Sequence, residues 1–210
     1  MEELDLLKKN WNKNENYPKI SEEKIYVMLH KNSSSIVKWI FIISILEILF
    51  WSLLSILTND DEYFNLLELY HIKEPILVLT FLNYGVILYF IYLFYKNYKK
   101  VSATDSVKAL LENILNTRKT VKMYVLYNLI MIFVLLSIVF VFQVKYDPRI
   151  SGIVKSFGGE TATGYILLAG VYLIFITAIV LFIWLFYKVI YGFLVKRLTK
   201  NYNELQKIDY

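Results

Sequence analysis

Four long apolar runs alternate with polar segments along the chain. They cover residues 36–57, 76–95, 124–144 and 165–187, and each reaches the ~20 residues that a helix needs to cross a ~30 Å hydrocarbon layer. The runs are apolar on all sides, whereas membrane-spanning strands alternate apolar and polar residues over ~10 positions. The pattern therefore predicts an all-α integral membrane protein, a four-helix transmembrane bundle with amphipathic cytoplasmic helices.

The polar segments between the runs give the expected organisation. We expect an N-terminal segment 1–35, an external acidic loop 58–75, a cytoplasmic helical connector 96–123, a second external loop 145–164 and an amphipathic cytoplasmic tail 188–210. Composition agrees, because 57% of the residues are hydrophobic and 17% aromatic, more than one soluble core of this size would bury. The first 35 residues are polar, so no cleavable signal peptide is expected.

Basic residues predict the orientation. Nineteen of the 23 Lys and Arg residues lie in segments 1–38, 96–122 and 188–210, and four lie in 58–75 and 145–164. Because cytoplasmic loops of membrane proteins are enriched in Lys and Arg, both termini are expected on the cytoplasmic side of the membrane. Anionic lipid headgroups would attract this basic face. No groove-reading motif accompanies the charge, so nucleic acid is not an expected partner.

Segment 1–35 contains two short helical patterns. Leu4, Leu7 and Trp11 recur at helical spacing before a polar break. Ser21 then has the character of a helix N-cap, and the next apolar positions on one face are Ile25, Met28 and Leu29. The polar stretch 32–35 is expected to loosen the join to the first span. The segment either lies on the bilayer surface or docks on a protein partner.

The connector and the tail each show an amphipathic pattern. Ser102 and Asp105 bound a candidate capping box at the start of the connector helix, and its apolar face consists of Val107, Leu110, Leu111, Ile114 and Val121. The tail repeats apolar residues at helical spacing at Ile190, Phe193, Leu194, Leu198, Tyr202 and Leu205. We expect the connector helix to pack under the bundle.

Several stretches resemble a group of uncharacterised small membrane proteins of Flavobacterium-like bacteria. The stretches that carry this resemblance are 4–11, 21–26, 28–31, 33–39 and 201–208, and the similarity extends over the whole chain. The resemblance implies an inner-membrane protein and brings no established activity.

One ionisable residue lies inside an apolar run. Glu47 is close to the middle of run 36–57, where a charged side chain costs about 2.5–3.5 kcal/mol on insertion scales. We therefore expect it to face other helices or a partner, with Asn83 and Tyr84 of the second run at similar depth and Ser44 one turn away. Its role is either a hydrogen bond between helices or a proton or cation site, as in a small channel or transporter.

Other chemistry finds little support in the sequence. Cysteine is absent, and the two histidines, His30 and His71, are expected on opposite sides of the membrane, so no catalytic residue, metal site or cofactor is predicted. The adjacent acids Asp60, Asp61 and Glu62 are interpreted as solvated. The protein is not expected to be an enzyme.

These patterns favour a membrane protein that binds a protein partner. The first hypothesis is an accessory subunit or scaffold of a membrane complex, which binds through its spans and its cytoplasmic helices. The residues expected to contact the partner are Leu4, Leu7, Trp11, Ile25, Met28 and Leu29. Two alternatives remain open: a membrane-tethered regulator that sequesters a cytoplasmic factor, in the manner of an anti-sigma protein, and a small channel or transporter that uses Glu47.

Overall fold

The computed structural model describes residues 21–58, 61–156 and 162–207 of the chain. Six helices account for nearly all of them: α2 (Glu22–Thr58), α3 (Asp61–Leu69), α4 (Lys73–Ser102), α5 (Val107–Tyr146), α6 (Pro148–Ser156) and α7 (Ala162–Gln206). The fold is all-α in the part of the chain that the structure describes. Four of the helices are long and apolar enough to cross a membrane, which agrees with the predicted multi-pass class.

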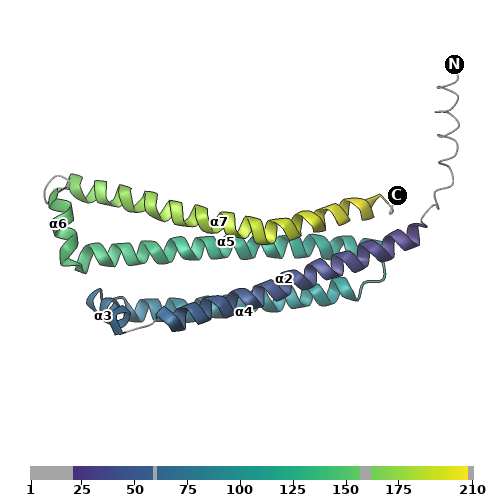
Figure 1. The fold of residues 1–210 in the computed structure, drawn as a ribbon, viewed down its shortest axis with the longest axis horizontal. Coiled ribbons are helices and arrows are strands. Elements are labelled where there is room, and N and C mark those ends of the chain that lie inside the picture. Colours follow the sequence, from purple (N-terminus) through teal and green to yellow (C-terminus); the bar gives the residue numbers. More distant parts are fainter. Residues whose placement is uncertain (1–20, 59–60, 157–161, 208–210) are drawn as a thin grey trace, which may run out of the picture.

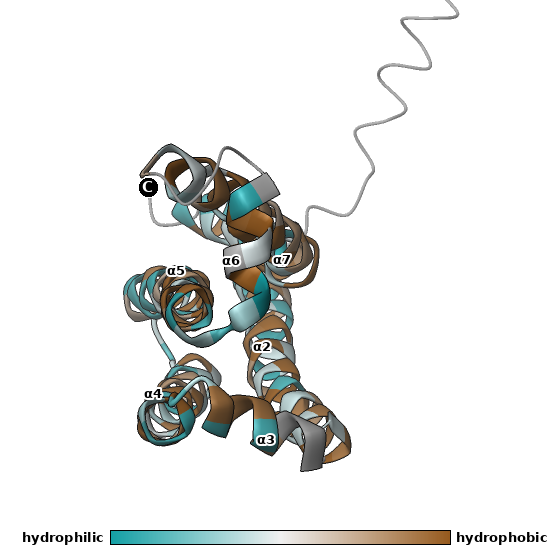
Figure 2. Cartoon of the chain, turned by 90° about the vertical axis from the view of Figure 1, so that its left-hand side faces the viewer, coloured by the Kyte–Doolittle hydropathy of each residue, from teal (hydrophilic) through white to brown (hydrophobic). Residues whose placement is uncertain are grey.

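The four long helices run antiparallel to their neighbours in the sequence and form one elongated bundle (Figure 1). Packing follows the cyclic order α2, α4, α5, α7, with α2 closing against α7. The start of α2, the α4–α5 turn and the end of α7 lie at one end, called here the terminal end. The short helices α3 and α6 lie across the opposite end, called here the loop end (Figure 2).

The long helices are more continuous than the sequence pattern indicated. α2 runs through residues 32–35 without a break, so the expected loose join is wrong. The expected connector helix is the first part of α5, and only residues 103–106 separate α4 from α5. The polar residues Asn32 and Ser33 do not interrupt α2, because their side chains form hydrogen bonds with Asn201 of α7.

Two helix starts test the capping predictions. The backbone N–H of Lys24 donates to the Ser21 hydroxyl at 3.4 Å, as expected for an N-cap. The cap of α5 is Ser106, whose hydroxyl accepts from the Ala109 N–H at 3.3 Å. The capping box expected from Ser102 to Asp105 is therefore wrong, because Ser102 still belongs to α4.

The main hydrophobic core occupies the terminal half of the bundle. All four long helices contribute buried residues to it: Leu29, Ile36, Val37, Ile40, Phe90, Phe94, Val101, Leu110, Ile114, Val121, Tyr124, Tyr187, Tyr191, Leu198 and Leu205. The faces predicted for the connector and the tail supply five of these positions: Leu110, Ile114, Val121, Leu198 and Leu205. The apolar faces predicted near the ends of the apolar runs therefore form part of this core. The packed terminal half of the bundle, built around the residues named above, is called here the head.

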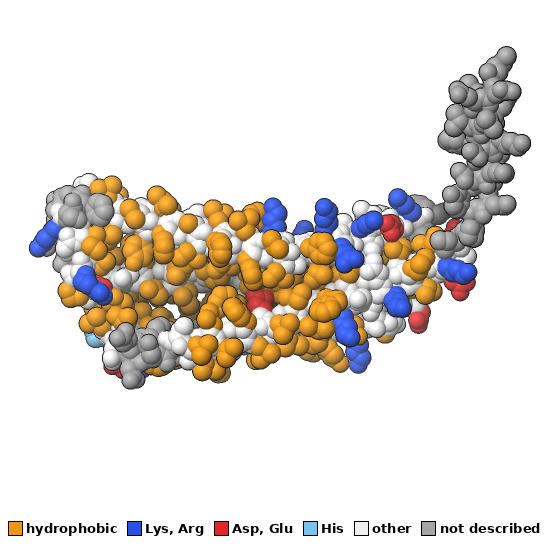
Figure 3. Space-filling model, in the orientation of Figure 1, with side chains coloured by type: hydrophobic (Ala, Val, Ile, Leu, Met, Phe, Trp, Pro, Cys, Tyr) orange, Lys and Arg blue, Asp and Glu red, His pale blue; other side chains and the backbone are white. Residues whose placement is uncertain are grey.

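The loop half of the bundle is packed more loosely. Two small clusters close it, one around Leu67, Tyr70, Ile72 and Ile76 and one around Ile150, Val154 and Leu168. In the most apolar 18-residue stretch of each long helix, at most 11% of the residues are buried. Hydrophobic side chains therefore dominate the visible surface of this half, while basic side chains gather over the terminal half (Figure 3).

Candidate functional site

The Glu47 carboxylate on α2 accepts hydrogen bonds from two tyrosines of α7. The Tyr187 hydroxyl donates to Oε1, and the Tyr191 hydroxyl donates to Oε2 at 2.9 Å. The two tyrosines lie one turn apart on the same face of α7, so one carboxylate can accept from both. Both carboxylate oxygens therefore have a partner, and Glu47 links the first long helix to the last, as the hydrogen-bonding reading of this residue requires.

An aromatic cluster surrounds this pair of bonds. The Tyr124 ring of α5 lies at its centre, with ring centroids 5.4 to 6.2 Å from those of Phe90, Phe94, Tyr187 and Tyr191. Most of these contacts are edge-to-face, which is a favourable arrangement for aromatic rings. Tyr124 and Tyr191 are almost fully buried. The rings that hold Glu47 are therefore packed against aromatic residues of α4 and α5.

The polar residues expected beside Glu47 have other partners. The Asn83 side-chain oxygen accepts from the Tyr127 hydroxyl at 3.0 Å. The Tyr84 hydroxyl lies 3.5 Å from that of Ser52, and the buried Ser44 donates to the Phe41 carbonyl at 2.7 Å. The polar groups that bond to Glu47 are those of Tyr187 and Tyr191, whereas Asn83, Tyr84 and Ser44 have these other partners. Asn83 and Ser52 instead link α4 to α5 and α2 to α4.

The reason lies in the register of α2 against the other helices. Glu47 is in the middle of run 36–57, but its partners Tyr187 and Tyr191 follow the end of run 165–187. Tyr124, in contact with both, is the first residue of its run. Glu47 therefore lies level with the ends of the apolar runs of α5 and α7, next to the first basic residues beyond them, Lys122 and Lys188. An acidic side chain is visible at this boundary between hydrophobic and basic surface (Figure 3).

A second polar joint connects α2 and α7 nearer the terminal end. The buried Asn201 donates to the Ser33 hydroxyl at 3.0 Å and accepts from the Asn32 side chain at 3.2 Å. Both Ser33 and Asn201 lie inside the packed head. The polar stretch that seemed to interrupt the amphipathic pattern is thus a specific contact with the tail helix, and each polar group in it is satisfied, as burial demands.

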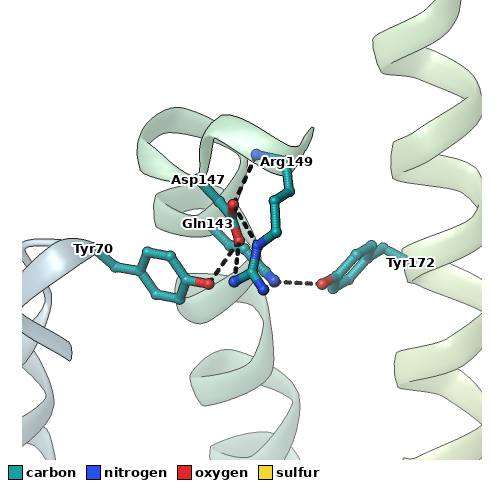
Figure 4. A network of polar contacts seen from close by, with 5 residues as sticks. All are labelled: Tyr70, Gln143, Asp147, Arg149 and Tyr172. Carbon is teal, nitrogen blue, oxygen red and sulfur yellow. Dashed lines mark hydrogen bonds and ion pairs between the residues drawn. The ribbon is translucent and has the colours of Figure 1, made fainter. Parts of the chain in front are cut away.

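A third network lies at the loop end and joins three segments (Figure 4). Asp147, between α5 and α6, is buried and accepts from the Tyr70 hydroxyl at 2.8 Å. The Arg149 side chain donates to both of its carboxylate oxygens at 3.1 Å, and the Arg149 N–H adds a bond of 2.9 Å. Alongside, the Tyr172 hydroxyl of α7 donates to the Gln143 side chain. The network fixes the α5–α6 corner against the turn between α3 and α4.

These hydrogen bonds shift the pKa values of Asp147 and Tyr70. The bonds from Arg149, with a smaller contribution from Tyr70, hold the pKa of Asp147 at about 2, below its ordinary value. Burial and the neighbouring carboxylate raise the pKa of Tyr70. Asp147 is therefore ionised at neutral pH and paired with an exposed arginine, which is the arrangement of a structural clasp.

The residues expected to bind a partner have mixed outcomes. Leu4, Leu7 and Trp11 lie outside the described residues. Leu29 is buried in the head, and Ile25 packs against the same core, because their face of α2 points toward the other helices. Met28 is 53% exposed and lies beside the equally exposed Val27. Of the described members of the predicted set, Met28 alone remains open to a partner.

Sequence reasoning did not find the tyrosines of the Glu47 site or the Asp147 network. The available signal for Tyr187 and Tyr191 is their spacing of four residues, which places both on one face of a helix. For Asp147 the signal was an Asp-Pro-Arg sequence after an apolar run, which is typical of a turn.

The comparisons with known proteins concern the whole bundle. Residues 23–210 match the model of a family described as a domain of unknown function, DUF8845. The chain belongs to this family. The DUF8845 region begins one residue into α2, so the family unit is the helical bundle with its head. Neither the comparison with curated proteins nor that with solved structures finds a match.

Proposed function

We propose that the protein is a non-enzymatic accessory subunit or scaffold of a complex in a bacterial inner membrane, with both termini in the cytoplasm. The loop half would lie in the bilayer, and the terminal half would form a cytoplasmic head. The resemblance to proteins of Flavobacterium-like bacteria is the reason for proposing this type of membrane.

Charge supports this placement. Lys96 and Lys188 follow the apolar runs of α4 and α7, Lys122 precedes that of α5, and all three are exposed. Basic residues near span ends favour the cytoplasmic side. Beyond these lysines, the head buries its apolar residues in its interior, as a soluble helical domain does. The α3 and α6 end carries few of the basic residues.

The single observation that carries the partner proposal is the contrast between the two halves. The head buries its apolar faces within the chain, whereas at most 11% of the most apolar stretch of each span is buried. Spans associate in lipid through close van der Waals packing and hydrogen bonds. Spans with so little internal packing leave broad surfaces for the helices of another subunit.

The head also offers a specific contact surface. Val27 and Met28 are each more than half exposed on the outer face of α2, and they line a shallow depression of about 610 Å³ with Ser21, Glu23 and Lys24. Exposed apolar residues grouped at a surface are typical of protein contacts. We infer that this depression is part of the docking surface on the cytoplasmic side.

Copurification tests the proposal. A tagged chain is isolated from its host in mild detergent, beside the variant Val27→Ser/Met28→Ser and the control Leu115→Ser, which removes an exposed apolar residue from α5 of the head. We expect membrane-protein subunits to copurify with the original chain and the control, and to be depleted with the double variant. Isolation of the original chain without any protein partner contradicts the proposal.

A small channel or transporter that uses Glu47 is the second candidate. The observation in its favour is that Glu47 is only partly buried and that, within the described residues, it has tyrosine partners but no ion pair. A carboxylate without a basic partner could exchange a proton or bind a cation. Loss of transport in Glu47→Gln with unchanged folding would favour this candidate.

A further inference from the structure

A groove runs between α5 and α7 on the outside of the bundle, at the level of Glu47. Its volume is about 420 Å³, within the range of small-molecule sites. It is lined by Val121, Lys122, Val125, Leu126, Leu129, Trp184, Tyr187, Lys188, Tyr191, Gly192 and Val195. The rings of Tyr187 and Tyr191 form its floor while their hydroxyls are held by Glu47, so the groove is shaped by the site described above.

The charge in this groove has one sign. Lys122 and Lys188 line it from the two helices, and none of the lining residues is acidic. Within the described part of the chain neither lysine forms an ion pair. The Lys188 ammonium lies 4.7 Å from the centroid of the Trp184 ring, a cation–π contact that keeps the charge beside the groove. Two basic side chains, one from each helix, therefore line an otherwise largely apolar groove.

Polarity changes along the length of the groove. Leu126, Leu129 and Trp184 line the part nearer the loop end, where the helices are most apolar. Lys122 and Lys188 belong to the level at which the apolar runs end. An amphiphile with an anionic head and an apolar chain would match both parts at once.

We propose that this groove binds one anionic glycerophospholipid of the cytoplasmic leaflet. Its phosphate would lie between the ammonium groups of Lys122 and Lys188, and an acyl chain would lie against Val125 and Leu129. The inference rests on the membrane placement proposed above and is independent of a protein partner. The lipid would brace α5 against α7 on the side opposite to Glu47.

The test uses the purified full-length chain in a neutral detergent. Native mass spectrometry measures the binding of added phosphatidylglycerol and of phosphatidylcholine as one-to-one adducts. We expect phosphatidylglycerol to bind more tightly, and Lys122→Gln/Lys188→Gln to weaken it roughly thirtyfold, since each lysine near an anionic lipid contributes about a fivefold gain. The control Lys119→Gln/Lys196→Gln removes two exposed charges of the same helices outside the groove and should leave the affinity nearly unchanged.

A second variant tests the groove itself. A Cβ at Gly192 would lie 3.6 Å from Lys188 Cγ, an ordinary contact, and leucine is a better helix former than glycine. Gly192→Leu should therefore fold and fill the groove, and the affinity for phosphatidylglycerol should fall to that for phosphatidylcholine. Equal affinity of the original chain for the two lipids overturns the proposal, and so does an equal loss in the control pair or unchanged binding in Gly192→Leu. None of these results depends on copurification of a protein.

Discussion

Glu47 illustrates how an acid is accommodated at the edge of an apolar layer. Its two oxygens accept from two phenols, and phenols are apolar over most of their surface. The tyrosines thus satisfy the carboxylate while their rings fill the core with Tyr124. Unpaired polar groups would be costly at this position, because buried donors and acceptors without partners cost about 1–3 kcal/mol each.

We predict that Glu47→Gln is tolerated and Glu47→Leu is not. Glutamine keeps the shape and one good acceptor, whereas leucine leaves the hydroxyls of Tyr187 and Tyr191 without partners. The loss of stability in Glu47→Leu should be about 2–4 kcal/mol. Thermal unfolding of the purified variants in detergent measures it.

A compensating variant makes this prediction specific. Adding Tyr187→Phe and Tyr191→Phe to Glu47→Leu removes the unpaired hydroxyls and should restore much of the lost stability, because replacing all partners by apolar groups can be nearly neutral. If Glu47→Gln is as unstable as Glu47→Leu, the carboxylate has a role beyond accepting these two bonds.

Asp147 predicts a dependence of stability on pH. Hydrogen bonds hold its pKa at about 2 in the folded protein, against an ordinary value of 3.8. The stabilisation is therefore fully present above about pH 4 and is lost as the pH falls toward 2. We expect Asp147→Asn to melt at a lower temperature than the original chain at neutral pH, with the difference shrinking between about pH 4 and 2.

The exposed Glu68 provides the control for this prediction. It pairs with Lys73 at the surface, and such exposed pairs contribute little to stability. Glu68→Gln should change the melting temperature little at any pH. A difference between Asp147→Asn and the original chain that stays constant down to pH 2 would show that ionised Asp147 does not stabilise the corner.

At the scale of the element, the decisive feature is the continuity of α2. One helix of 37 residues carries both the face that packs into the head and the apolar run. Its first part is held to α7 by the hydrogen bond between Ser33 and Asn201. The packed terminal half and the apolar run are therefore parts of one continuous helix.

Proline at position 35 tests this continuity. Ser35 is exposed within α2, so Ser35→Ala should change stability little. Ser35→Pro removes a helical hydrogen bond and clashes with the preceding turn, at a cost of about 3 kcal/mol or more. Chemical denaturation of both variants measures the difference. Equal stability of the two would mean that residues 32–35 form a flexible join.

The sequence predicted the elements better than their register. Periodicity at Leu110, Ile114, Leu198 and Leu205 indicated faces that are indeed buried, because polar residues alternate with apolar ones there. Within the spans every position is apolar, so no face is marked. The position of Glu47 within run 36–57 therefore predicted a depth similar to that of Asn83. In the structure, the packing of α2 against α7 places Glu47 beside Tyr187.

Over the whole molecule, the proposed placement puts the two halves of the bundle in different solvents, lipid for the loop half and water for the head. Burial of apolar side chains drives packing of the head, whereas lipid tails would remove that driving force in the loop half. This difference explains why the largest buried cluster lies in the head and not in the most apolar stretches of the long helices. Composition locates the spans, but only three-dimensional contacts reveal that the head is the packed part.

Cysteine labelling tests the central claim, that the loop half spans the membrane and the head is cytoplasmic. The chain has no cysteine, so single exposed sites can be introduced cleanly at Glu74 near the loop end, Glu112 in the head and Phe182 in the apolar part of α7. A membrane-impermeant maleimide is applied to intact cells whose outer membrane has been opened, and then to lysed cells. We expect Glu74→Cys to react in both, Glu112→Cys only after lysis and Phe182→Cys in neither. Labelling of Glu112→Cys before lysis, or of Phe182→Cys at all, would contradict the account.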